Sequence, residues 1–225
     1  MAQAESTLTA PPKKPATSEK PANLGARTVR SFQKRGVLGS LRVLAALAVV
    51  VALVTFSTPT WPWVLLGTPF VALGEIWRAW AAGHLLKSKE LAISGPYRHV
   101  QNPLYFGRLC ILIGFGLMAS MPETLGGHVL PANLIVLGAM LAIFFGYYIP
   151  RKKRVEGERL QRLHGEAYAE FARAVPLIIP MFRAWGRNAR PWTAERFNDN
   201  DEGWMVVFVT LVTAAFWAKA LGLFA

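Results

Sequence analysis

The sequence predicts an all-α, polytopic integral membrane protein with about five transmembrane helices. Of its 225 residues, 53% are hydrophobic, and the mean hydropathy is +0.30, which is too apolar for an ordinary soluble domain. A helix needs about 20 consecutive apolar residues to cross a bilayer. Five segments meet this requirement, namely 36–56, 61–82, 104–121, 129–149 and 204–224.

The formal net charge of +12 suits either a nucleic-acid-binding protein or a membrane topology, and the distribution of basic residues favours the topology. Seven Lys or Arg precede the first span, three lie between the second and third spans, and eleven lie in 151–196. Loops 57–60 and 122–128 contain none. The positive-inside rule therefore predicts a cytoplasmic amino terminus, cytoplasmic basic loops held near anionic lipid, and a carboxyl terminus on the other side. We expect a bacterial inner-membrane protein without a nucleic-acid partner.

The spans divide the chain into four parts. Residues 1–35 are rich in Pro, Ala, Lys, Ser and Thr, which predicts a disordered basic cytoplasmic tail. We do not expect a cleaved signal peptide, because this segment has no apolar core followed by a cleavage site. Residues 36–180 form the expected membrane core, with four spans and one amphipathic cytoplasmic helix. Residues 181–203 are a cytoplasmic or interfacial linker, and 204–225 carry the last span. The single cysteine, Cys110, allows no intrachain disulfide and no cysteine metal cluster, and no metal site is expected.

The first polar stretch, 83–108, contains two pairs of chain-breaking residues. Gly-Pro at 95–96 and Asn-Pro at 102–103 force two turns within a short segment. The polar residues between them are Tyr97, Arg98 and His99. From local chemistry alone, this stretch is either a functional site or a connecting loop that carries positive charge.

The second polar stretch, 151–174, begins with four consecutive basic residues and continues as an amphipathic helix. Its apolar stripe consists of Leu160, Leu163, Ala167, Phe171 and Val175. One step of four backwards places Glu156 on the same face, where a semi-buried carboxylate needs a partner. A neighbouring arginine such as Arg154 is the simplest partner. A separate, solvated face carries Glu158, Arg162, Glu166 and Glu170.

Charged residues within the second and third predicted spans need partners or a path to the membrane surface. Glu75 and Arg78 lie one helical turn apart, so the simplest expectation is that they pair with each other. The alternative is that they line a polar cavity. Arg108 lies near the end of its span, where its side chain can reach the membrane surface.

Two motifs in this order resemble the isoprenylcysteine carboxyl methyltransferase family and related membrane phospholipid methyltransferases. GPYRHVQNPLYFG at 95–107 is followed, after one span, by VEGERLQRLHGEAYAEFARAVPLIIP at 155–180, and LGEIWRAWAAGHLLKSKEL at 73–91 resembles the family's lead-in. The resemblance covers 73–180, about half of the chain. It implies a bundle of membrane helices whose cytoplasmic segments close over S-adenosylmethionine, with an opening into the bilayer for the acceptor.

The resemblance also implies the site residues. Those expected to bind S-adenosylmethionine are His84, Tyr97, His99, Asn102, Pro103, Tyr105, Gly107 and Glu156, and those expected to be catalytic are Arg98, Tyr105 and Glu156. Glu156 would face the sulfonium, Arg98 and His99 would donate to the cofactor carboxylate, and Tyr97 and Tyr105 would form aromatic walls. The chain departs from the family pattern at Gly157, His164 and Leu177, which leaves the lipophilic or lipidated acceptor undefined.

Two other functions fit the same sequence. Membrane sterol reductases share a similar turn and use NADPH, but they carry a Lys-Tyr-Gly element where this chain has Leu163-His164-Gly165. A non-enzymatic membrane scaffold, whose basic loops bind anionic lipid or a protein partner, is the second alternative.

Overall fold

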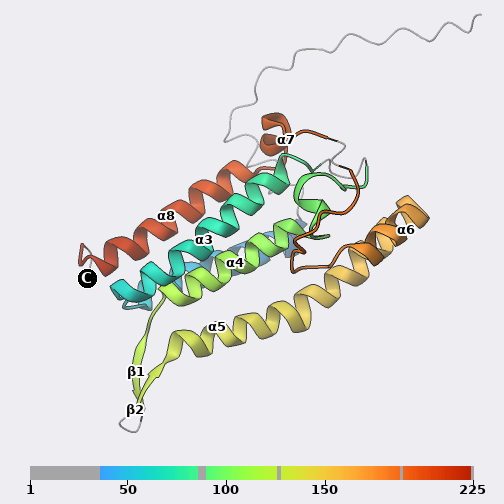
Figure 1. The fold of residues 1–225 in the computed structure, drawn as a ribbon. Coiled ribbons are helices and arrows are strands. Elements are labelled where there is room, and N and C mark those ends of the chain that lie inside the picture. The colour runs from blue at the N-terminus through green and yellow to red at the C-terminus, as the bar shows by residue number, and fades with distance from the viewer. Residues whose placement is uncertain (1–35, 86–89, 126–127, 188–189, 224–225) are drawn as a thin grey trace, which may run out of the picture. The chain divides into compact units, whose positions relative to one another are not determined.

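The computed structural model describes residues 36–85, 90–125, 128–187 and 190–223 (Figure 1). The predicted tail, 1–35, lies outside these residues. The chain divides into two compact units, 1–49 and 50–225. Helix α2 (Gly36–Phe56) contains the boundary between them, and the fold below is that of the second unit.

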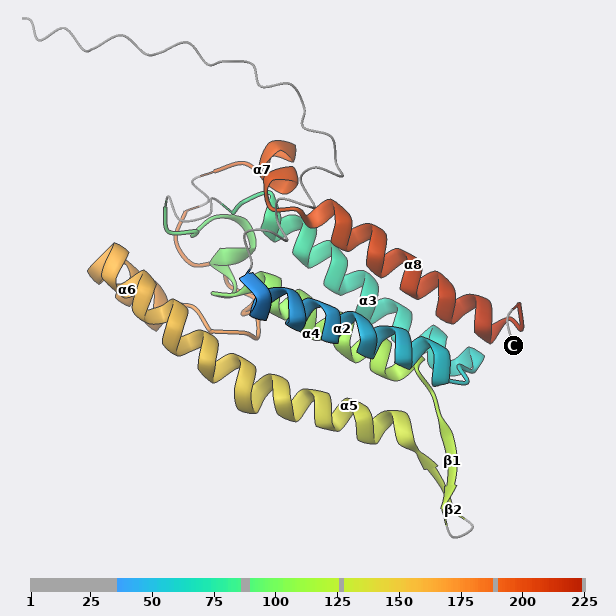
Figure 2. The ribbon, with the colours of Figure 1, turned by 180° about the vertical axis from the view of Figure 1, so that it is seen from behind.

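Helices make up most of the second unit. In chain order, the elements after α2 are α3 (Trp61–Ala82), the 3-10 turn η1 (Gly95–Arg98), α4 (Pro103–Met118), β1 (Pro122–Leu125), β2 (His128–Pro131), α5 (Ala132–Ile143), the π-helical segment η2 (Phe144–Tyr148), α6 (Ile149–Ala174), α7 (Ala194–Asp199) and α8 (Glu202–Ala220). Strands β1 and β2 form one antiparallel hairpin. Helices α3, α4 and α8 run alongside one another, and α5, η2 and α6 form one long helical ribbon that diverges from them (Figures 1 and 2).

The predicted fold class is confirmed in part. Two helical stretches, Asn133–Ala174 and Glu202–Ala220, are long and apolar enough to cross a membrane, whereas Leu47–Phe56 and Pro103–Met118 are apolar but shorter. The expected start of the fourth span, at residue 129, falls in β2, and the helix begins at Ala132. The arrangement with five spans therefore stays a prediction.

One hydrophobic cluster joins four helices. Its buried members come from the end of α2, from α3, α4 and α8, and from the residue after α4: Leu53, Val64, Val71, Phe115, Met118, Ala119, Val209, Val212 and Phe216. This cluster lies away from the segments that carry the two sequence motifs.

Helices α3 and α4 approach each other closely at four glycines. A Cβ atom added at Gly67 would lie 2.5 Å from the carbonyl oxygen of Gly114, and one added at Gly74 would lie 2.6 Å from that of Gly107. Real side chains do not fit at these distances, because the neighbouring atoms belong to the backbone. Small residues allow such close helix packing in membrane proteins, where packing contacts rather than the hydrophobic effect drive association.

A buried ion pair connects α3 to α8. Arg78 Nη2 donates to Glu202 Oε2 at 2.5 Å, and the two side chains are 3% and 10% exposed. The predicted pair of Glu75 with Arg78 is therefore wrong, because the carboxylate that receives the hydrogen bond comes from the amino-terminal end of α8. Both carboxylate oxygens of Glu75 are buried and have no hydrogen-bond partner among the described residues.

Loop 57–60 meets the residues that directly follow α4 at one end of the bundle. Thr58 N donates to Ser120 O at 2.9 Å, and Ser120 Oγ donates to Thr58 O at 3.0 Å. At the same end, Lys219 Nζ donates to the backbone carbonyls of Val54, Thr55 and Ser57. The segments that carry both motifs lie at the other end, so the polar chemistry is concentrated on one side of the bundle.

Candidate functional site

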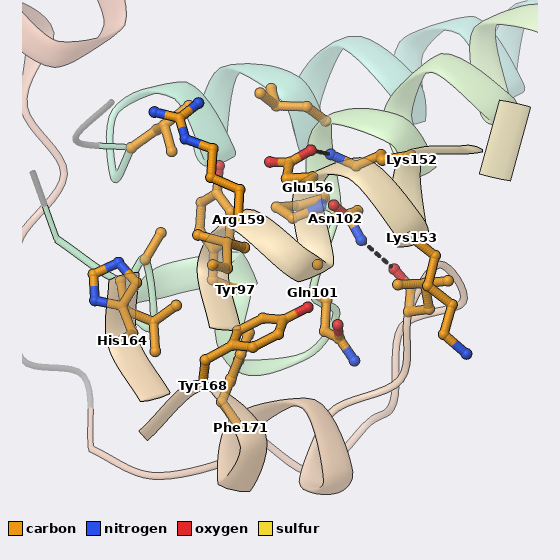
Figure 3. Close-up of a pocket in the computed structure, with 18 of the residues that line it drawn as sticks. Tyr97, Gln101, Asn102, Lys152, Lys153, Glu156, Arg159, His164, Tyr168 and Phe171 are labelled. Carbon is orange, nitrogen blue, oxygen red and sulfur yellow. Dashed lines mark hydrogen bonds and ion pairs between the residues drawn. The ribbon is translucent and has the colours of Figure 1, made fainter. Parts of the chain in front are cut away.

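A cavity of about 250 Å3 lies between the first motif and α6. Its wall is formed by residues from segment 90–92, from 97–105 and from one face of α6, and by Leu177 (Figure 3). The cavity therefore lies between the two segments that the sequence singled out.

The cavity wall contains five of the predicted site residues. They are Tyr97, Asn102, Pro103, Tyr105 and Glu156. The three positions that depart from the family pattern, Gly157, His164 and Leu177, line the same cavity. Burial raises the pKa of Tyr97, so this phenol stays protonated at neutral pH.

Arg98 and His99 of the first motif hold the backbone of segment 181–186, which directly follows the second motif. Arg98 Nε donates to Trp185 O at 3.0 Å, Arg98 Nη2 donates to Gly186 O at 2.5 Å, and His99 Nδ1 donates to Met181 O at 3.0 Å. Neither Arg98 nor His99 lines the cavity. The structure thus places both side chains outside the cavity wall and shows them bonded to backbone carbonyls, and their expected contacts with a ligand stay a prediction.

Gly107 and His84 also lie away from the cavity wall. Gly107 is part of the α3–α4 contact, where a Cβ atom would lie 2.4 Å from Arg78 Cγ, so helix packing accounts for this glycine. His84 is buried beneath η1 and lines a second cavity of about 120 Å3 together with Ser94. Gly95 has a φ of +59°, and a Cβ atom there would lie 2.3 Å from the His84 ring. The turn therefore requires glycine for its backbone conformation and for its contact with His84.

The two motifs are joined by further hydrogen bonds. Gln101 Nε2 donates to Val175 O at 2.6 Å, Gln101 N donates to Pro176 O at 2.9 Å, and Asn102 Nδ2 donates to Leu177 O at 3.1 Å. Asn102 also precedes the first residue of α4. These bonds fix the end of α6 against the start of α4 and close one side of the cavity.

Glu156 lies in the cavity wall and pairs with Lys152, one helical turn earlier, rather than with Arg154 (Figure 3). The Glu156 side chain is 49% exposed and that of Lys152 is 12% exposed, so the carboxylate is less buried than the stripe predicted. Lys152 Nζ also lies 4.1 Å from the centre of the Tyr105 ring. The ammonium group thus lies against both a carboxylate and an aromatic face, and both stabilise a cation.

The cavity face of α6 differs from the predicted stripe. Gly165 has a φ of 52° and a ψ of −128°, which interrupts the helix. Ala167 is exposed, whereas Glu156, Leu160, His164 and Tyr168, spaced by four residues, all line the cavity. Repeated steps of four residues forward from Glu156 identify this face in the sequence.

Three basic residues, which the sequence analysis assigned to membrane topology, line the cavity. They are Lys152, Lys153 and Arg159. Together with Glu90 and Glu156 they give the wall both signs of charge, and Tyr97, Tyr105, Tyr168 and Phe171 contribute aromatic surface. Such a wall suits a ligand with an aromatic ring and charged groups of both signs.

No family model, curated protein or solved structure matches this chain.

Proposed function

We propose that this protein is an integral membrane methyltransferase with five spans, which uses S-adenosylmethionine to methylate a lipophilic acceptor. The observation that carries the proposal is the environment of Lys152, whose ammonium lies between the Glu156 carboxylate and the Tyr105 ring. The sulfonium of S-adenosylmethionine is also a cation and requires the same kind of surroundings. The resemblance of both motifs to membrane methyltransferases points to the same cofactor.

The other groups of the cofactor also have suitable partners in the cavity. Its adenine can pack on an aromatic wall such as the Tyr168 ring, and its carboxylate can accept from Lys153 or Arg159, in place of the Arg98 and His99 that the sequence suggested. The cavity volume of about 250 Å3 lies just below the range of about 300 to 1,000 Å3 that is usual for small-molecule sites. NADPH is a much larger dinucleotide with several phosphates, so the size of the cavity favours S-adenosylmethionine over the reductase alternative.

The cofactor would supply an electrophilic methyl group, and the protein's own residues would align the reactants and exclude water. A carboxylate or thiolate acceptor needs no general base. For an amine or thiol acceptor, Glu156 is the candidate base, with Tyr105 as the alternative, because both side chains line the cavity whereas His99 lies outside its wall.

Calorimetry on the purified full-length protein tests the proposal. S-adenosylhomocysteine should bind and NADPH should not. Glu156→Gln should weaken the binding of S-adenosylmethionine about ten-fold, because a hydrogen bond to a charged group contributes about 1.5 to 3 kcal/mol and Glu156 is half-exposed, which favours the lower value.

Glu166→Gln is the matched control. Glu166 is on the same helix, but its side chain is 81% exposed and pairs with Arg173, so its loss should change binding little. The double variant Lys152→Gln/Glu156→Gln separates a direct contact of Glu156 from an effect through Lys152. Binding of NADPH alone would support a reductase, and binding of neither ligand would support a scaffold. If Glu156→Gln and Glu166→Gln bind S-adenosylmethionine with equal affinity, Glu156 is excluded from the site.

A further inference from the structure

Two large apolar side chains project from segment 177–182, beside the cavity. Ile179 is 67% exposed and Phe182 is fully exposed. Single exposed apolar residues are common on proteins, but here two project from six consecutive residues. Their surroundings indicate what they contact.

The backbone of this segment is fixed. Asn102 Nδ2 donates to Leu177 O, and Met181 N donates to His99 O at 2.9 Å. Just beyond the segment, Trp185 N donates to Arg98 O at 2.9 Å. Because these bonds hold both ends, Ile179 and Phe182 are displayed outward by an ordered backbone.

The buried residue Ile178 shows how far segment 177–182 lies from the end of α4. Ile178 packs against Leu109 of α4 and Phe144 of η2. Leu109 lies six residues after the first residue of α4, which corresponds to about 9 Å along a helix axis at about 1.5 Å per residue. The segment therefore reaches below the end of α4, to the level of the apolar helix surfaces.

Basic residues follow the apolar pair directly. Arg183 and Arg187 are both exposed, and Arg183 is the neighbour of Phe182. An aromatic side chain at the edge of the hydrocarbon region, with arginines extending towards the lipid headgroups, is the typical arrangement at a membrane interface. Arginine also favours contact with anionic headgroups.

From the fixed backbone, the depth and the adjacent charges, we propose that Ile179 and Phe182 insert into the lipid leaflet that surrounds this end of the bundle. They anchor segment 177–182, and with it the wall of the cavity that contains Leu177, at the membrane surface. The cavity is thereby held beside the lipid from which a lipophilic molecule can enter. The anchor does not depend on methyl transfer and can be tested separately from it.

Spin labelling in bilayers tests the anchor. Cys110 is buried and is the single cysteine of the sequence, so Cys110→Ala gives a cysteine-free background. In this background, Ile179→Cys and Phe182→Cys are labelled individually with a nitroxide. The full-length protein is placed in vesicles of phosphatidylethanolamine and phosphatidylglycerol, and collisions with oxygen and with a water-soluble nickel chelate are measured. We expect high accessibility to oxygen, and accessibility to nickel several-fold lower than that of a label in water.

Two control positions give the accessibility expected of a label in lipid and of a label in water. Ile135→Cys, on the exposed face of α5, reports lipid, and Glu158→Cys, exposed on α6, reports water. Labels at 179 and 182 that collide with nickel as often as the label at 158 would overturn the proposal. Labels that are protected from both reagents would also overturn it, because they would show a protein contact instead of lipid. Both replaced side chains are exposed, so the substitutions remove little packing.

Discussion

The contact between α3 and α4 differs from α5 and η2 in how glycine is used. Glycines 67, 74, 107 and 114 allow two backbones to touch, whereas a Cβ atom at Gly138 or Gly146 would meet nothing within 4 Å. The same amino acid is thus required in one region and replaceable in the other. The comparison shows that α3 and α4 leave no space between them, and that the cavity lies where α6 diverges.

The ion pairs of the two regions differ in the same way. The Arg78–Glu202 pair is almost completely buried, while Glu156 in the Lys152–Glu156 pair is half-exposed. A buried pair that loses one partner leaves a charge without compensation, whereas a half-exposed carboxylate can exchange its partner at a lower cost. The first pair suits a structural connection, and the second suits a site where an incoming cation or anion can replace a partner.

Removing the buried carboxylate should have the largest effect. Glu202→Gln leaves the Arg78 guanidinium buried without a counter-charge, which should lower the free energy of unfolding by about 3 to 5 kcal/mol. Thermal unfolding of the detergent-solubilised protein, followed by size-exclusion chromatography, measures the effect. The double variant Arg78→Met/Glu202→Met should recover much of the loss.

The exposed pair of Glu166 with Arg173 provides the control for this comparison. Glu166→Gln should change the free energy of unfolding by less than about 1 kcal/mol. If Glu202→Gln behaves like the control, Glu75 has replaced Glu202 as the partner of Arg78, and the connection between α3 and α8 is not essential.

A methyl group in the glycine contact should have the next largest effect. Gly74→Ala places Cβ 2.6 Å from the carbonyl oxygen of Gly107, so the two helices must separate, at a cost of about 1 to 3 kcal/mol. Gly138→Ala lies in a helix with open space around it and should stabilise the protein by up to about 1 kcal/mol. Melting temperatures that fall for position 74 and rise for position 138 would support the difference between the two regions, and equal shifts would contradict it.

The smallest effect should come from protonation of His84. Burial, together with the charge of Arg196, lowers the pKa of His84 below its ordinary value of 6.5. The unfolded chain therefore binds a proton more readily than the folded one, so the contribution of His84 to stability is complete above pH 6.5 and is lost as the pH falls through the folded pKa. We expect acidification from pH 7 to pH 5 to lower the melting temperature of the wild type more than that of His84→Gln. Parallel curves for the two proteins would exclude this role of His84.

Part of the candidate site could be predicted from the sequence because it depends on short-range patterns. The Gly-Pro and Asn-Pro pairs mark the turns that place Tyr97 and Tyr105 in the cavity wall, and Glu156 was found from helical spacing. The spacing rule did not reveal the break at Gly165, whose left-handed φ shifts the residues that follow it. The basic residues at 152 and 153 were interpreted through topology alone, since a charge count does not say what a side chain contacts.

By itself, the sequence determined the helical character of the chain and the concentration of polar chemistry in two segments, because hydropathy and chain-breaking residues act locally. Only the tertiary structure decided which groups meet. It paired Arg78 with Glu202, 124 residues away, and directed Arg98 and His99 to the backbone of 181–186 instead of the cavity. It also showed that Gly107 serves helix packing. The physical reason is that buried hydrogen-bond donors and charges take the partner that the packing of the helices brings near, and no local pattern encodes that distance.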